Sequence, residues 1–75
     1  MPHKIVILGA AESGVGAALL AQQQGYEVFV SDSGEIKEAL QQELEQHHIP
    51  FEQGSHSWEK ISGADERVKS PGIPE

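Results

Sequence analysis

A short aliphatic run that breaks into a glycine loop and then opens a helical pattern constrains this chain most strongly. Residues 5–8 are Ile-Val-Ile-Leu, as in a strand buried on both faces of a parallel sheet, and glycines follow at positions 9, 14 and 16. Glycine lets a backbone approach a phosphate closely, and the N-terminus of a helix carries partial positive charge. The segment therefore predicts the strand–turn–helix unit of a nucleotide-binding domain.

The rest of the chain alternates further strand and helix patterns. We expect strands at residues 5–8, 28–30, 49–52 and around 67–69, helices over 14–24 and 35–47, and a single helical turn near 58–61. This alternation predicts an α/β fold with a Rossmann-like parallel sheet in the strand order 3-2-1-4. A complete domain of this class would continue beyond residue 75. We therefore expect one truncated three-layer α/β/α domain over residues 1–75, cut from a longer protein.

Ligands of such sheets bind beyond the carboxyl ends of the strands, where three loops are expected to meet: residues 9–16, 32–34 and 70–72. In the first loop, Gly9 and Gly14 fit the outer positions of the G-x-G-x-x-G fingerprint, and Ala11 stands at the middle one. We expect Ser13 to cap the following helix and to donate to a phosphate. Gly16 is expected to permit close packing of that helix on the sheet.

Asp32 ends the second apolar run, 23 residues after Gly9. In dinucleotide-binding domains, an acidic residue about 20 residues beyond the glycine loop accepts a hydrogen bond from the ribose hydroxyl. The other interpretation is an Asx turn that caps the next helix. The position of Asp32 at the end of a strand favours a role in ligand binding.

Composition excludes several classes of function. The formal charge of -7 argues against sequence-independent binding to nucleic acid, which needs a basic face. The chain has no cysteine, and its four histidines lack the spacing of metal ligands. No apolar run is long enough for a signal peptide or a membrane span. A small anionic ligand remains compatible with this charge, because distant surface carboxylates are screened.

Three segments together resemble the N-terminal domain of the Mur ligase family, and most of all its D-glutamate-adding branch. They are Gly9-x-x-x-Ser13-Gly14-x-Gly16, Val30-Ser31-Asp32-Ser33 and Lys69-Ser70-Pro71-Gly72-Ile73, and the resemblance covers essentially the whole chain. In that family this domain anchors the UDP part of a UDP-linked muramoyl substrate. The resemblance implies a diphosphate loop at Glu12, Ser13 and Gly14, uracil and ribose contacts at Asp32, Ser33 and Gly34, and a pocket closed by Ser70, Pro71 and Gly72.

The resemblance also implies that the full-length protein is an ATP- and Mg²⁺-dependent amide-forming ligase of cytoplasmic peptidoglycan synthesis. The family's G-x-x-G-K-[ST] loop for ATP is absent from these 75 residues. We therefore expect this chain to be a monomer that binds the substrate without catalysis, with no catalytic or metal-binding residue of its own and no nucleic-acid or membrane partner. An NAD-binding Rossmann module is the alternative, and an interaction domain that has lost its ligand is a third possibility.

Overall fold

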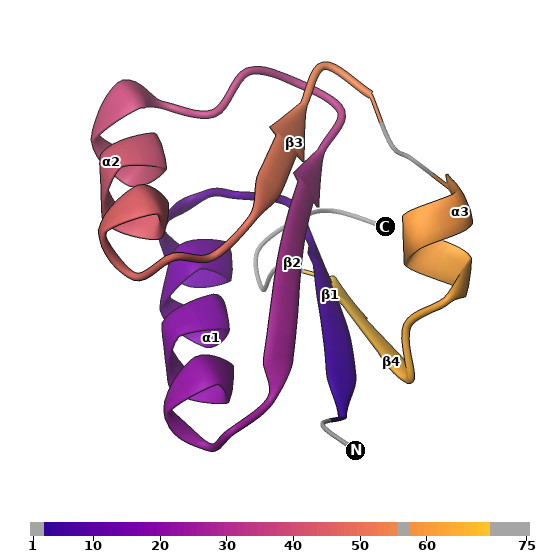
Figure 1. Ribbon diagram of the computed structural model, residues 1–75. Helices are drawn as coiled ribbons and strands as arrows, with labels where there is room; N and C mark the ends of the chain where they lie inside the picture. Colours follow the sequence, from indigo (N-terminus) through magenta and orange to yellow (C-terminus); the bar gives the residue numbers. More distant parts are fainter. Residues whose placement is uncertain (1–2, 56–57, 70–75) are drawn as a thin grey trace.

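The computed structural model describes residues 3–55 and 58–69, whose seven elements alternate between strands and helices (Figure 1). In chain order they are β1 (Lys4–Leu8), α1 (Glu12–Gln23), β2 (Glu27–Asp32), α2 (Glu38–Gln46), β3 (Phe51–Gln53), α3 (Trp58–Ser62) and β4 (Glu66–Lys69). The four strands form one parallel sheet in the order β3-β2-β1-β4. The predicted fold class and strand order are therefore confirmed.

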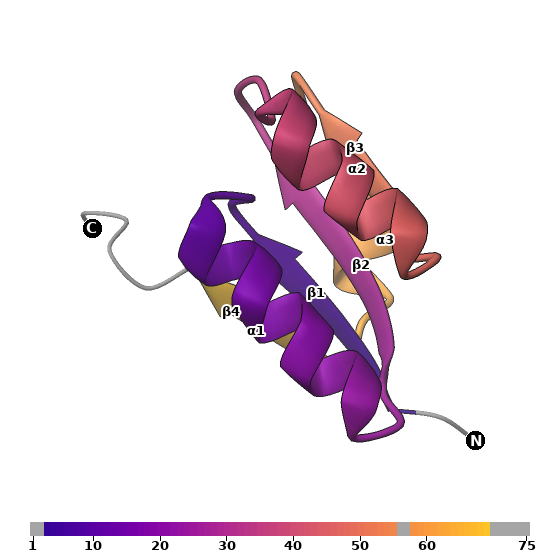
Figure 2. The ribbon, with the colours of Figure 1, turned by 90° about the vertical axis from the view of Figure 1, so that its left-hand side faces the viewer.

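The helices lie on both faces of the sheet. Helices α1 and α2 cover one face and α3 covers the other, which gives three layers (Figures 1 and 2). Side chains at alternate positions of β1 and β2 point to the α1 and α2 face, where they join the main apolar core. The core residues that are buried on that face are Ile5, Ile7, Ala10, Val15, Ala18, Ala21, Val28, Val30, Ile36, Leu44 and Ile49.

The α3 face has a smaller buried set. Val6 and Ile61 are fully buried, and Lys60 Nζ of α3 lies 5.1 Å from the centre of the Phe29 ring on β2. Val6 and Phe29 are paired in register on neighbouring strands, so both point to the α3 face. A five-residue helix thus packs over the middle of the sheet.

The helix starts differ from the sequence expectations. Helix α1 begins at Glu12 rather than residue 14, and its N-cap is Ala11, which offers no side-chain bond. The expectation that Ser13 is the cap is therefore wrong, since Ser13 lies within the first turn. The expectation for Gly16 is also wrong: it is exposed, and an added Cβ would meet no atom within 4 Å.

Candidate functional site

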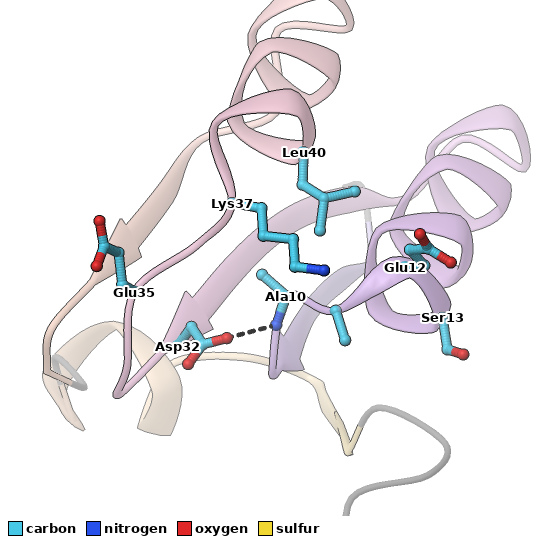
Figure 3. A pocket seen from close by; sticks show the side chains of 8 residues that line it. Ala10, Glu12, Ser13, Asp32, Glu35, Lys37 and Leu40 are labelled. Atoms are coloured by element: carbon cyan, nitrogen blue, oxygen red, sulfur yellow. Dashed lines mark hydrogen bonds between the residues drawn. The ribbon is translucent and has the colours of Figure 1, made fainter.

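A hollow of about 500 Å³ lies beyond the carboxyl ends of β1 and β2 (Figure 3). One wall comes from the β1–α1 loop and the first turn of α1, and the other from the segment that joins β2 to α2. The residues that line it are Ala10, Ala11, Glu12, Ser13, Asp32, Glu35, Lys37 and Leu40. Its volume falls in the range of small-molecule sites, about 300–1,000 Å³.

The β1–α1 loop turns sharply at Gly9, whose φ of 102° is a conformation that glycine adopts without strain. The Gly9 N–H donates to Ser31 O at 2.8 Å, which holds the loop against the end of β2. Ala11 has an extended backbone with φ −73°, so alanine fits the position of the middle glycine without strain. The first helical bond of α1 runs from Val15 N–H to Ala11 O.

Helical geometry leaves the first amides of α1 without an acceptor inside the helix. These are the N–H groups of Glu12, Ser13 and Gly14, and both Glu12 and Ser13 line the hollow. The Glu12 carboxylate stabilises the first turn through the helix dipole, but it also places a negative charge near these donors. Positive charge from another part of the hollow would therefore strengthen anion binding at this wall.

Asp32, the last residue of β2, connects the two walls. Its Oδ2 accepts the Ala10 N–H at 2.8 Å, and its Oδ1 accepts the Gly34 N–H at 2.8 Å. The second bond is the Asx turn considered in the sequence analysis. The turn does not cap α2, which begins only at Glu38. Each carboxylate oxygen keeps a further lone pair, so Asp32 can also accept a bond from a ligand.

The segment between β2 and α2 is fixed at Ile36, which is 1% exposed. The Ile36 N–H donates to Gln53 Oε1 at 2.9 Å, and Ile36 O accepts from Gln41 Nε2 at 2.7 Å. Gly34 O also accepts the Gly54 N–H at 2.9 Å. The ends of β3 and α2 thus hold this segment in place, and Lys37 follows directly as the N-cap of α2.

The charges around the hollow come from three carboxylates and one ammonium group. In Figure 3 the Glu35 side chain points away from the hollow, whereas the Lys37 side chain extends across it toward the β1–α1 loop. Lys37 is exposed, and among residues 3–55 and 58–69 no carboxylate lies within ion-pair distance of its ammonium group.

The expected site residues separate into three groups in the structure. Three of them line the hollow, namely Glu12, Ser13 and Asp32. Gly14 is buried in α1 beside them, and Ser33 and Gly34 are exposed in the Asx turn and do not line the hollow. Ser70, Pro71 and Gly72 lie outside the described residues.

Five lining residues were not among the expected site residues, namely Ala10, Ala11, Glu35, Lys37 and Leu40. The signal for Lys37 was a cation three residues beyond the turn glycine Gly34. Its importance depends on the long-range anchoring of Ile36, which no local pattern reveals.

No three His, Cys, Asp or Glu side chains within the described ranges gather as metal ligands would. None of the helices that the structure describes is long and apolar enough to cross a bilayer.

Comparison with known proteins identifies relatives along the whole chain. A family model described as the MurD N-terminal domain matches residues 4–75. The chain is 64% identical over 75 residues to a UDP-N-acetylmuramoylalanine--D-glutamate ligase of Cytophaga hutchinsonii, which covers all of this chain and 17% of that protein. The enzymes of the same name from Bacteroides thetaiotaomicron and Porphyromonas gingivalis are 56% and 53% identical, over 95% and 100% of this chain and 16% and 17% of theirs. The chain thus spans about one-sixth of the length of the curated relatives it matches.

Proposed function

The chain belongs to the family of MurD N-terminal domains, and from this premise we propose that its hollow holds the uridine diphosphate part of a UDP-linked muramoyl substrate. The observation that carries the proposal is the position of the hollow. It lies beyond the carboxyl ends of two adjacent parallel strands, against the open amides of the α1 N-terminus. Ligands of open α/β sheets bind at this edge, and phosphates bind at helix N-termini.

We assign the two walls of the hollow to different parts of the ligand. The first-turn amides of Glu12, Ser13 and Gly14 face the diphosphate, because backbone N–H groups and the helix dipole favour an anion. Asp32 takes the ribose and uracil, because its carboxylate oxygens can accept hydrogen bonds from their hydroxyl and N–H groups. Ser33 and Gly34 lie beside Asp32 in the Asx turn outside the hollow, and in this proposal they contact the part of the uridine that extends beyond it. Ser70, Pro71 and Gly72 complete the pocket in this proposal, as the family resemblance implies.

For the longer protein we propose the reaction in the names of the relatives, the addition of D-glutamate to UDP-N-acetylmuramoylalanine, in the cytoplasm. ATP and Mg²⁺ are the cofactors that the family resemblance implies. The residues of this chain do not fit either of them: the sequence has no G-x-x-G-K-[ST] loop, and residues 3–55 and 58–69 hold no cluster of metal ligands. We therefore assign substrate binding to this chain and expect no ATP turnover from it.

The proposal is tested by titrating the ¹⁵N-labelled chain with UDP, UDP-N-acetylglucosamine, NAD and ATP while amide chemical shifts are recorded. The uridine nucleotides should shift the amides of Ser13, Gly14 and Ser33 most strongly, with weak dissociation constants because the chain holds only part of the substrate's contacts. Stronger shifts at the same amides with NAD would favour an NAD-binding module instead. Absence of shifts with every nucleotide would refute a nucleotide site.

A further inference from the structure

We propose that Lys37 is the residue that pairs with the diphosphate in the hollow and sets its preference for phosphorylated over unphosphorylated uridine ligands. This inference rests on the proposed function and adds a binding residue to it.

Lys37 is held at a fixed point of the wall. The residue before it, Ile36, is buried, and both its N–H and its carbonyl are bonded, to Gln53 and Gln41 respectively. The carbonyl of Lys37 itself accepts the N–H groups of Leu40 at 3.0 Å and Gln41 at 2.9 Å, which starts α2. Only the side chain of Lys37 is therefore free to move, and its flexible stem extends across the hollow (Figure 3).

The charge of Lys37 is available to a ligand. The residue is exposed, and within the part of the chain that the structure describes no carboxylate lies within 4 Å of Nζ. The other seven lining residues include three carboxylates and no cation. A bound anion thus need not compete with an existing ion pair for this ammonium group.

The proposed ligand needs this charge. The dipole of α1 supplies about half a positive charge at its N-terminus, which is less than the charge of one phosphate group. Glu12, in the first turn of the same helix, cancels part of that field. Lysine is a common phosphate-binding residue that acts as a point charge, so an ammonium group at the opposite wall supplies what the amides lack. An uncharged uridine would gain nothing from it.

The test compares UDP with uridine in the 75-residue chain and its Lys37→Met variant, by amide shifts at constant ionic strength. Removal of one charged hydrogen bond should weaken UDP binding about tenfold and leave uridine binding unchanged. Lys37→Arg should retain most of the UDP affinity. Lys60→Met is the matched control, because Lys60 is an exposed lysine that lies over Phe29 on the α3 face.

A second readout is independent of the variants. With ¹³C-labelled lysine, UDP should shift the Cε signal of Lys37 more than the other lysine signals, and uridine should leave it in place. The inference would be overturned if the wild type and Lys37→Met bound UDP with equal affinity. It would also be overturned if Lys37→Met lost as much affinity for uridine as for UDP. Failure of the wild-type chain to bind any uridine ligand would instead overturn the proposed function.

Discussion

Replacement of Asp32 by alanine should destabilise the fold even without a ligand. The carboxylate accepts two backbone N–H groups at 2.8 Å, from Ala10 and Gly34. Ala10 is 2% exposed, so its N–H would lose its partner in a place that water reaches poorly. A hydrogen bond to a charged group contributes about 1.5–3 kcal/mol when it is shielded from water, as at Ala10, and less when it is exposed, as at Gly34. We therefore expect Asp32→Ala to lower the unfolding free energy by about 2 kcal/mol.

This loss is large for so small a domain. At about 0.05–0.15 kcal/mol per residue, a chain of this length has an unfolding free energy of only about 4–11 kcal/mol. The corresponding drop in melting temperature is about 8–16 °C. Urea denaturation followed by circular dichroism should show a lower midpoint with an unchanged slope, because the change removes stability without altering the surface exposed on unfolding.

Two further variants make this result specific. Asp32→Asn keeps one acceptor oxygen and replaces the other by a donor, so it should retain about half of the stability that alanine loses. Glu35→Ala removes an exposed carboxylate of the same hollow and should leave the midpoint unchanged. If Asp32→Ala and Glu35→Ala unfold at the same urea midpoint, then the bonds from Ala10 and Gly34 to Asp32 contribute nothing to stability, which refutes the prediction.

Three other substitutions test other parts of the fold. His48 has a φ of 57° just after the C-cap of α2, so His48→Gly should raise the unfolding free energy by about 0.5–1 kcal/mol in urea titrations, whereas Gly25→Ala, at φ 91°, should lower it. A destabilised His48→Gly variant would mean that a contact of the imidazole stabilises the fold by more than the positive φ of His48 costs. Arg67 is exposed on β4, an edge strand, so Arg67→Val should leave the melting temperature nearly unchanged and promote dimers in sedimentation velocity. A variant that stays monomeric at high concentration would show that the arginine does not protect this edge.

The sheet was predictable because its strands are marked by local patterns. Aliphatic runs in β1 and β2 and the turn glycines between elements sufficed to give the strand order, since right-handed parallel connections leave few alternatives. The helix starts were less predictable. Ile36 matches the apolar spacing of α2 but precedes that helix, because Gln53, which is 17 residues away, takes its N–H. Local spacing contains no information about such a partner.

The candidate site was predictable in its location and less so in its members. Strand ends and the glycine loop pointed to the edge of the sheet where the hollow lies, and Asp32 lines that hollow. Its function in joining the walls was not foreseen, because a bond to Ala10 depends on how two loops meet in space. Lys37 was missed for the same reason, since its position is set by the burial of Ile36 rather than by a motif.

The Ala10–Asp32 bond joins loops that are 22 residues apart in sequence, so the hollow between them exists only while the chain is folded. Any ligand of the hollow then acts as a partner in folding. At ten times its dissociation constant it would add about 1.4 kcal/mol to the unfolding free energy, or several degrees of melting temperature. A ligand of the hollow would thus lower the unfolded fraction of the chain, and with it the rate of any proteolysis that acts on the unfolded state.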